Sequence, residues 1–383
     1  MKTIVFFDGP EFDSLLPITY LRPCVLSPIG TGTILSQWQK LIDIKSYGFL
    51  TPDYLRKLYP YDSSSHDKIF INGASLPSKE LAKEIEALPT NSALFSGSDL
   101  ICFRSSLNFS NYADLVNETD KLEKQDFAVQ MIRYPEHLLD LSEAVLLSDY
   151  SNAKHSVNTP NTRHFKVIGQ DLHIGKNVKI LDAVLNTSTG PIMIDDGVEI
   201  MEGSVLRGPI YIGADSVISM GAKIYGNTII GRNCRVGGEV KRSTISNFSN
   251  KSHDGYMGDS FIGEWCNLGA NTINSNMKNS YGKVSLFDIQ KNEYRVTERQ
   301  FLGMILGDHT MTAINTSFNT GSVTGIFSNV LDKSPNRFTP SFSFGNQQYW
   351  VDKAIEIANR AMQRRNKSVT TAYESAIRFL AQS

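Results

Sequence analysis

The sequence lacks a surplus of charge of either sign, and this absence limits what the protein can bind. Its 38 Lys and Arg residues are balanced by 39 Asp and Glu residues, so the formal net charge is −1. A protein that follows a nucleic-acid backbone needs a basic face, and this composition supplies no excess from which to build one. We therefore expect no nucleic-acid partner.

Long apolar runs and paired cysteines are also missing. No stretch of eighteen apolar residues occurs, which argues against a membrane-spanning helix and a membrane partner. The first residues, MKTIVFFDGP, indicate a β-strand better than a signal peptide, because the apolar run is short and ends at an aspartate. The four cysteines show no paired spacing, as expected for buried thiols in a reducing cytoplasm.

What the sequence does contain is a six-residue repeat. A helix would need apolar residues spaced by three and four, and an ordinary strand by two. A period of six instead indicates short strands joined by tight turns, which is a parallel β-solenoid whose stacked coils bury a continuous column. The uninterrupted run of the repeat consists of Ile194, Ile200, Leu206, Ile212, Ile218, Ile224, Ile230 and Val236.

Beyond Val236 the repeat shifts twice, then breaks at 274–300, where we expect a protruding polar loop. It resumes at Leu306 and ends beyond Pro335. Tyr349–Arg365 and Val369–Ala381 have the pattern of amphipathic helices, with Ser368 as a candidate N-cap of the second. Because an open solenoid end exposes its apolar column, we expect these helices to cap it.

The first 150 residues alternate between strand and helix patterns, which favours an α/β domain with a parallel sheet. The elements that we expect are Thr3–Phe7 and Lys68–Ile71 as strands, and Ile34–Ile42 and Ser78–Leu88 as helices, the last with Ser78 near its N-cap. The predicted organisation is an α/β domain at 1–150, a polar linker at 151–165, an all-β solenoid at 166–335 and a helical tail at 336–383.

These sextets resemble the hexapeptide-repeat family, whose fold is a left-handed parallel β-helix. Within it the solenoid is most similar to the acetyltransferase half of the bifunctional N-acetylglucosamine-1-phosphate uridylyltransferase/glucosamine-1-phosphate acetyltransferases. The whole chain resembles the shorter variant of that enzyme described for Bacteroidetes. The resemblance implies a homotrimer with its site between subunits, an amino-sugar 1-phosphate as substrate and acetyl-CoA as co-substrate.

The resemblance also implies roles for a spaced set of residues. His253 matches the general base, a role for which histidine is suited because its unperturbed pKa lies near neutrality. The other matches are Glu239 near the base, Asn267 and Asn276 on the sugar and the reacting groups, Lys241 and Tyr256 on the sugar phosphate, Lys223 in place of a phosphate-binding arginine, Ala270 facing the thioester, and either Lys278 or Lys283 as a further lysine. No metal is implied at this site.

Two segments of the first domain, Leu16–Pro23 and 69–77, resemble the sugar-nucleotide pyrophosphorylases, but key positions depart from that pattern. Those enzymes cradle nucleotide phosphates in a glycine-rich loop, whereas this chain has Asp8-Gly9-Pro10. They hold Mg²⁺ with an aspartate, where this chain has Ala74. Our hypothesis is that nucleotidyl transfer is lost or rebuilt here, with Mg²⁺ used only if the domain is active, and Asp8 and Arg22 are its first candidate residues.

Alternatives remain open at this point. The chain could be a uridylyl- or thymidylyltransferase with a structural or regulatory β-helix, or a scaffold in which both sites have decayed. The γ-type carbonic anhydrases bind Zn²⁺ through three histidines on the same fold, but this solenoid has too few suitably spaced histidines. His309 could be structural or could line the CoA channel. The sugar, the acyl group, the CoA contacts and nucleotide binding by the first domain are not determined by the sequence.

Overall fold

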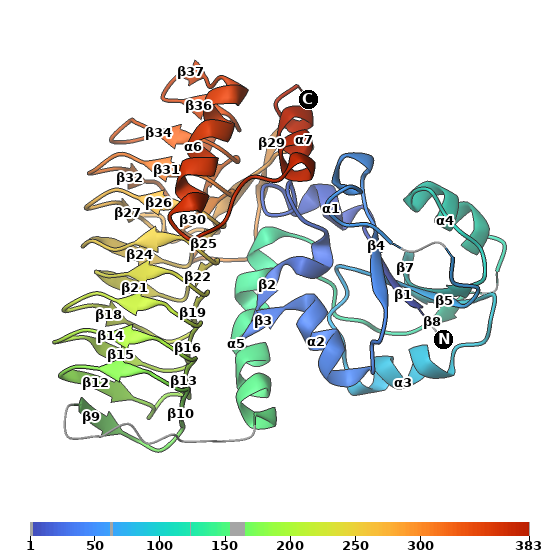
Figure 1. Cartoon of the computed structure of the whole chain (residues 1–383), viewed down its shortest axis with the longest axis horizontal. Helices are drawn as coiled ribbons and strands as arrows, with labels where there is room; N and C mark the ends of the chain where they lie inside the picture. Colours follow the sequence, from blue (N-terminus) through green and yellow to red (C-terminus); the bar gives the residue numbers. More distant parts are fainter. Residues whose placement is uncertain (1–2, 62–63, 123, 154–164, 383) are drawn as a thin grey trace.

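The computed structural model describes residues 3–61, 64–122, 124–153 and 165–382. A six-stranded mixed sheet forms the centre of the N-terminal domain (Figure 1). The expected parallel arrangement holds for its first three strands, but β7 runs antiparallel because the chain reverses direction at Gly97, which has a φ of +60°. In spatial order the strands are β4 (Tyr47–Leu50), β1 (Thr3–Phe7), β5 (Lys68–Asn72), β7 (Asp99–Ser105), β6 (Ser92–Ser96) and β8 (Gln125–Asp126).

Helices and short turns surround this sheet. The expected strands and helices at 3–7, 34–42, 68–71 and 78–88 are present, and the Ser78 hydroxyl accepts the N–H of Leu81 at 3.1 Å. The last helix, α5, extends past the expected domain end to Asn152, and residues 154–164 of the expected linker lie outside the described residues. The elements are α1 (Glu11–Ser14), η1 (Cys24–Leu26), β2 (Pro28–Ile29), β3 (Gly32–Thr33), α2 (Ile34–Leu41), η2 (Asp53–Leu55), α3 (Lys79–Ala87), α4 (Tyr112–Thr119) and α5 (Pro135–Asn152).

A parallel β-helix follows, which confirms the fold predicted from the six-residue repeat (Figure 1). Its short strands pair with those of the next coil and form three sheets. The first face consists of β10 (Leu172–Ile174), β13 (Ile192–Ile194), β16 (Ile210–Ile212), β19 (Thr228–Ile230), β22 (Thr244–Ile245), β25 (Phe261–Ile262), β30 (Met304–Leu306), β33 (Ser322–Thr324) and β35 (Phe338–Thr339).

In each coil, the strand of the second face comes directly before the corner that leads to the third face. It consists of β11 (Lys179–Ile180), β14 (Glu199–Ile200), β17 (Val217–Ile218), β20 (Arg235–Val236), β23 (Asn250–Lys251), β26 (Asn267–Leu268), β31 (Met311–Thr312), β34 (Asn329–Val330), β36 (Ser343–Phe344) and β37 (Gln347–Gln348). The third face consists of β9 (Phe165–Ile168), β12 (Ala183–Asn186), β15 (Val205–Arg207), β18 (Lys223–Ile224), β21 (Glu239–Lys241) and β24 (Tyr256–Gly258), with β27 (Ile273–Asn274) and β32 (Ser317–Phe318) pairing in further coils.

The repeating aliphatic side chains fill the column inside the coils. All eight members of the uninterrupted run are buried in one hydrophobic cluster. Lys251 is an exception, because it occupies a column position and is only 2% exposed. Its ammonium group donates to the carbonyl oxygens of His253 at 2.8 Å and Gly237 at 3.3 Å.

Aromatic rings replace the usual turn residues along the corner between the first and second faces. Phe248, Trp265, His309, Phe327 and Phe342 all have positive φ and lie on successive coils. The planes of neighbouring rings are within 5–11° of parallel, with centroids 4.1–6.2 Å apart. Left-handed backbone is unfavourable for bulky residues, and this continuous stack is the contact that offsets the strain.

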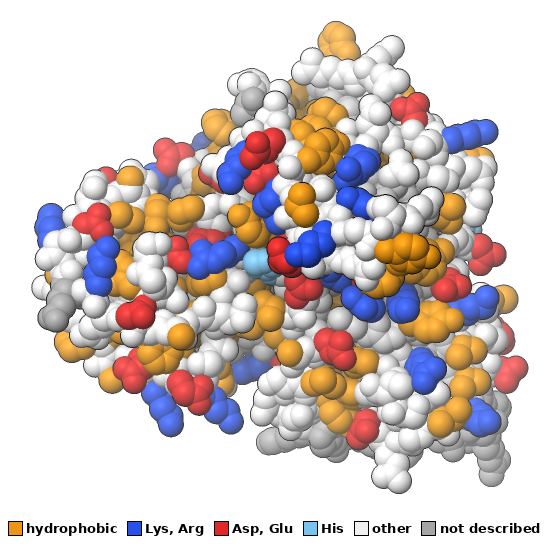
Figure 2. Space-filling model, turned by 180° about the vertical axis from the view of Figure 1, so that it is seen from behind, with side chains coloured by type: hydrophobic (Ala, Val, Ile, Leu, Met, Phe, Trp, Pro, Cys, Tyr) orange, Lys and Arg blue, Asp and Glu red, His pale blue; other side chains and the backbone are white. Residues whose placement is uncertain are grey.

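The segment at 274–300 is a β-hairpin and not the protruding loop that we expected. It consists of β28 (Ser285–Asp288) and β29 (Glu293–Val296), and it buries Val284 and Leu286 in a hydrophobic cluster that the N-terminal domain shares with the upper coils and the C-terminal helices. Arg295 also pairs with Glu136 of α5 at 2.7 Å. Acidic and basic side chains gather at this junction on the rear of the molecule (Figure 2). The segment has only a few apolar side chains, and these pack against another domain and not into the column of the solenoid. The sequence therefore showed no repeat here and looked polar.

The two C-terminal helices, α6 (Val351–Gln363) and α7 (Thr371–Leu380), lie beside the solenoid and not over its end, where β36 and β37 pair (Figure 1). The N-cap of α7 is Thr370, whose hydroxyl accepts the N–H of Tyr373 at 3.2 Å, so the expectation for Ser368 was wrong. Phe379 of α7 stacks on Tyr54 of the N-terminal domain. The helices therefore join the two domains. Among the described helices, none is both long and apolar enough to cross a bilayer.

Candidate active site

Two neighbouring strands of the third face hold most of the predicted phosphate-binding residues side by side. Glu239 of β21 pairs with Tyr256 of β24, and Lys241 pairs with Gly258. Lys223 of β18 pairs with Glu239 from the coil below. Because neighbouring strands lie about 4.8 Å apart, these side chains share one outward-facing surface.

His253 is exposed at the corner that leads from the second face to this surface. The corners of neighbouring coils contain four residues, and His253 and Ala270 each occupy the second place of theirs. The corner between β20 and β21 contains only Gly237 and Gly238. A Cβ on Gly237 would come within 2.3 Å of the carbonyl oxygen of Ser252, so the glycine corner fits directly against the turn that carries His253.

Tyr256 and Asn276 are in direct contact. The amide nitrogen Nδ2 of Asn276 donates to the Tyr256 hydroxyl at 3.0 Å and to Asp259 Oδ2 at 2.7 Å. The tyrosine lies back over Gly258, where an added Cβ would come within 2.2 Å of the hydroxyl. Burial, and then the nearby carboxylates of Asp259 and Glu239, raise the pKa of Tyr256, so the hydroxyl stays protonated and able to donate.

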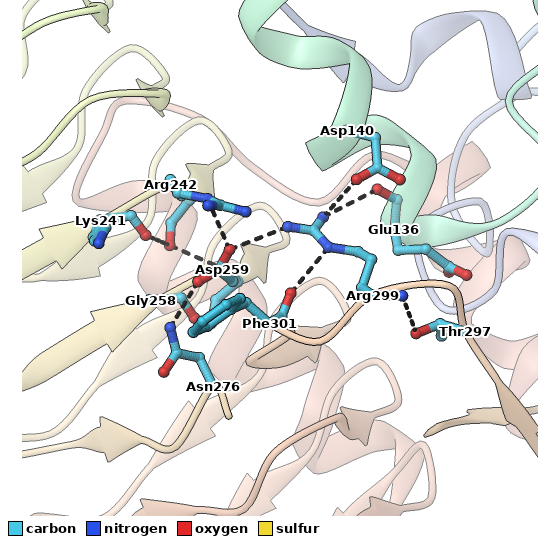
Figure 3. Close-up of polar contacts among 12 residues, drawn as sticks. Glu136, Asp140, Lys241, Arg242, Gly258, Asp259, Asn276, Thr297, Arg299 and Phe301 are labelled. Atoms are coloured by element: carbon cyan, nitrogen blue, oxygen red, sulfur yellow. Dashed lines mark hydrogen bonds and ion pairs between the residues drawn. The ribbon is translucent and has the colours of Figure 1, made fainter. Parts of the chain in front are cut away.

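Asp259 lies at the centre of a charged network that joins this surface to the N-terminal domain (Figure 3). Its carboxylate is 1% exposed and accepts from Arg242 Nε at 3.0 Å and from Arg299 Nη2 at 3.1 Å. Arg299 also pairs with Asp140 of α5 at 3.2 Å. The network fixes Asn276, and through it Tyr256, relative to α5.

Asn267 and the two candidate lysines lie apart from this contact. Asn267 is exposed on the second face, where its side-chain oxygen accepts from Asn250 at 3.4 Å. Lys278 Nζ donates to the carbonyl oxygen of Lys283 at 2.7 Å, and Lys283 forms an ion pair with Glu298. Both lysines thus belong to the base of the hairpin, and the contacts do not choose between them.

His309 is a structural residue. It is stacked between Trp265 and Phe327, and its Nε2 lies 2.9 Å from the Tyr373 hydroxyl of α7. Burial, and then the positive charge of Arg22, lower the pKa of His309 to about 3. A neutral imidazole enclosed by aromatic rings joins α7 to the solenoid and does not line an open channel.

Arg22 is also occupied by the solenoid. Its guanidinium group is buried, 2.5 Å from Asp308 Oδ2 and 3.6 Å from Glu264 Oε2. Burial by itself would lower the pKa of Arg22. The two nearby carboxylates have the larger combined effect, so the pKa of Arg22 is raised. Arg22 therefore anchors the N-terminal domain to the solenoid.

The first domain offers a poor fit to Mg²⁺ at the places expected from the pyrophosphorylases. Asp8 is buried and accepts from the Cys24 N–H at 2.8 Å and the Thr51 hydroxyl at 2.6 Å, and burial raises its pKa to about 6. Ala74 is fully buried and contributes only a methyl group. Among the described residues, no group of three His, Cys, Asp or Glu side chains could hold a metal ion.

Sequence reasoning missed the three charged residues that organise the network. Arg242 directly follows Lys241, and Asp259 follows the strand that contains Tyr256. Their closeness in sequence to predicted site residues could therefore have identified these two as candidates. Arg299 had no such signal, because the segment 274–300 carries no repeat that would place it.

Comparison with known proteins agrees with this two-part architecture. Residues 4–157, less than half of the chain, match a family described as sugar nucleotidyl transferase. The relatives include two archaeal proteins named bifunctional protein GlmU. One, from Methanococcus aeolicus, is 35% identical over 42% of this chain, and the other, from Methanocaldococcus jannaschii, is 38% identical over 26%. The aligned regions span only 38% and 22% of the length of those relatives.

Solved structures of hexapeptide-type enzymes are also similar to the chain, although distantly. The polySia-specific acetyltransferase NeuO matches with a TM-score of 0.26 and 15% identity, covering 56% of this chain and 95% of its own. The Arabidopsis UDP-N-acetylglucosamine acyltransferase matches with a TM-score of 0.19 and 16% identity, covering 58% of this chain and 89% of its own. Structural similarity at these scores does not indicate a function. The β-helix is identified from the strand pairing of this chain alone.

Proposed function

We propose that the chain is a CoA-dependent N-acetyltransferase that acts on an amino-sugar 1-phosphate, with glucosamine 1-phosphate and acetyl-CoA as the substrates. It would be a short, Bacteroidetes-type variant of the bifunctional enzymes, and a soluble protein that acts in the cytoplasm. The observation that carries the proposal is the meeting of Lys241, Tyr256 and Asn276 on one surface, with His253 exposed at its edge. The GlmU-named relatives and the matched nucleotidyltransferase domain support it.

The proposed chemistry is direct acyl transfer. The sugar amine attacks the thioester carbonyl, the C–N bond forms and the C–S bond breaks, while His253 takes the amine proton and delivers it to the leaving sulfur. Lys241 supplies a point charge for the sugar phosphate and Tyr256 supplies a hydroxyl donor. A cysteine acyl-enzyme is disfavoured, since Cys234 is buried and burial raises its pKa to about 12.

We further propose that the active assembly is a homotrimer in which a neighbouring subunit completes the surface beside His253. Exposed apolar side chains support this, because Met220 and Ile314 are 68% and 63% exposed. Both occupy the same corner position as His253 in their own coils. Apolar side chains aligned along one edge of a prism favour association with a second copy.

The test replaces the proposed base and follows both activities of the bifunctional relatives. His253→Ala should lower thiol release from acetyl-CoA with glucosamine 1-phosphate by about 10²–10⁴-fold. His66→Ala, at an exposed histidine of the first domain, is the matched control and should change little. Unchanged turnover in His253→Ala would refute the assignment.

The matched nucleotidyltransferase family favours a second candidate activity in the first domain. The same preparations are therefore incubated with UTP, Mg²⁺ and N-acetylglucosamine 1-phosphate, and pyrophosphate release is followed. We expect no robust release, because Asp8 is held by Cys24 and Thr51 and Ala74 offers no oxygen ligand. Robust release that survives His253→Ala would favour the nucleotidyltransferase alternative.

A further inference from the structure

A groove with a volume of about 460 Å³ lies between α6 and the second face of the solenoid. Its floor is the outward row formed by Arg235, Asn250 and Asn267 on three successive coils. Its wall is α6 with the turn that follows it, which contributes Ile357 and Arg364 among others. The groove therefore lies on a different face from the surface that holds Lys241 and Tyr256.

The groove is strongly cationic. Arg235, Arg364 and Arg365 line it, and within the described part of the chain none of the three forms an ion pair. Arg232 and Lys367 lie nearby, with their charged groups 5.3 and 5.8 Å from the centroid of the Phe248 ring. Burial, and then the charges of Arg235 and Arg364, lower the pKa of Arg365, because these positive groups lie close enough to repel one another.

A solvated surface patch is the plain alternative, and two observations weigh against it. The whole chain has a net charge of −1, so five cations that form no ion pair with any described residue depart, around one groove, from an evenly mixed surface. The C-terminal dipole of α6 favours a cation near its last turn, but it does not explain Arg235, which comes from β20. The charge is assembled from separate elements around a concave site.

The groove leads toward the proposed base. Ser252, which precedes His253 in the chain, lines it together with Asn250 and Asn267. These polar side chains connect the arginine-rich end with the corner that carries His253. A ligand held at the arginines can thus extend along a hydrogen-bonding floor toward that corner.

We propose that this groove binds the phosphorylated nucleotide end of the acyl donor, with Arg235, Arg364 and Arg365 holding its phosphate groups. The ligand class is a nucleoside bisphosphate, because a cluster of guanidinium groups matches the fork geometry of several phosphate oxygens. This assignment rests on the proposed acetyltransferase function for the identity of the ligand. It goes beyond that function in placing the donor on the second face.

Binding is tested first by calorimetry with adenosine 3′,5′-bisphosphate on the full chain. The double variant Arg364→Ala/Arg365→Ala should bind at least tenfold more weakly than the wild type, and Arg235→Ala should also bind more weakly. Lys179→Ala is the matched control, because Lys179 is an exposed cation on the same face three coils away, and it should bind as the wild type does. Equal affinity in all variants, or equally tight binding of inorganic phosphate, would overturn the proposal.

A second arm separates the groove from the proposed function. If acetyl transfer occurs, the arginine variants should raise KM for acetyl-CoA at least tenfold and leave KM for S-acetylpantetheine, which lacks the nucleotide, unchanged. An unchanged KM for acetyl-CoA would refute the groove while the function stands. If the wild type transfers no acetyl group, the proposed function fails and the calorimetry alone decides the groove.

Discussion

Lys251 shows how one residue can break the repeat for a local purpose. The repeat places an aliphatic side chain at this position, yet its ammonium group is buried and donates to the carbonyl oxygens of His253 and Gly237. Burial lowers the pKa of Lys251 to about 8 from its usual 10.5. The lysine therefore ties the turn that carries His253 to the glycine corner below it.

This buried charge predicts a specific dependence of stability on pH. Between about pH 8 and 10.5 the unfolded lysine holds its proton while the folded one has released it, so the unfolding free energy should rise with pH across that window. Lys251→Met should remove that rise. Urea unfolding of both proteins from pH 7.5 to 10.5 measures it, and a difference between them that does not change with pH would contradict the argument.

At the residue scale, the sequence predicted side chains whose spacing follows the coils. Glu239, Lys241 and Tyr256 could be placed because a solenoid brings residues from one coil next to those of the next. Arg299 could not be placed, since its partners, Asp259 and Asp140, belong to distant elements. Whether the predicted set works as a catalytic site stays a prediction.

The hairpin β28–β29 and helix α5 meet the solenoid through one buried carboxylate. Asp259→Ala would leave Arg242 and Arg299 without their shared partner, and removing one side of a buried charge network costs about 3–5 kcal/mol. Urea unfolding should show a loss of this order, and Asp332→Ala, at an exposed aspartate of the solenoid, should stay within about 0.5 kcal/mol.

A double-mutant cycle sharpens this test at the level of the two elements. Once Asp259 is absent, Arg299→Ala should cost less than it does in the wild type, because their contact is already lost. Additive losses, or a loss below about 1 kcal/mol for Asp259→Ala, would mean that the network does not hold the hairpin to the solenoid.

Elements were predictable where local signals decided them. The helix at Ser78 had an N-cap and an apolar face, and it formed as expected. The C-terminal helices were also found, but their position was wrong because it depends on distant contacts such as that between His309 and Tyr373. Hairpin β28–β29 was missed because its short apolar runs gave no period.

At the scale of the whole molecule, the proposed trimer depends on the edge that carries His253. Met220→Asp combined with Ile314→Asp places two charges on that edge without touching the buried column. Light scattering after size exclusion should show the mass fall from trimer to monomer, and acetyl transfer should fall with it. Leu107→Asp, at an exposed leucine of the N-terminal domain, should leave the mass unchanged. A double variant that keeps its mass would refute this interface.

The parallel β-helix could be predicted as far as Pro335 because its order is local, with each coil resting on the next. The expectation of a helical tail from residue 336 was wrong at its start, because β35 and β36 continue the first and second faces there without an apolar six-residue repeat. The joining of the two domains could not be predicted. Arg22 and Asp308 are 286 positions apart, and no periodic pattern relates them. The mixed strand directions of the N-terminal sheet were likewise not predicted, because they depend on the reversal of the chain at Gly97.

One hydrophobic cluster runs from Ile4 of the first strand through Phe261 and Ile326 of the upper coils to Ile377 of the last helix. A protease that cuts between the domains would therefore not release two independent proteins, and melting curves should show the halves losing structure together. For the same reason, an exchange of either half with a relative by recombination would have to replace the matching flank as well.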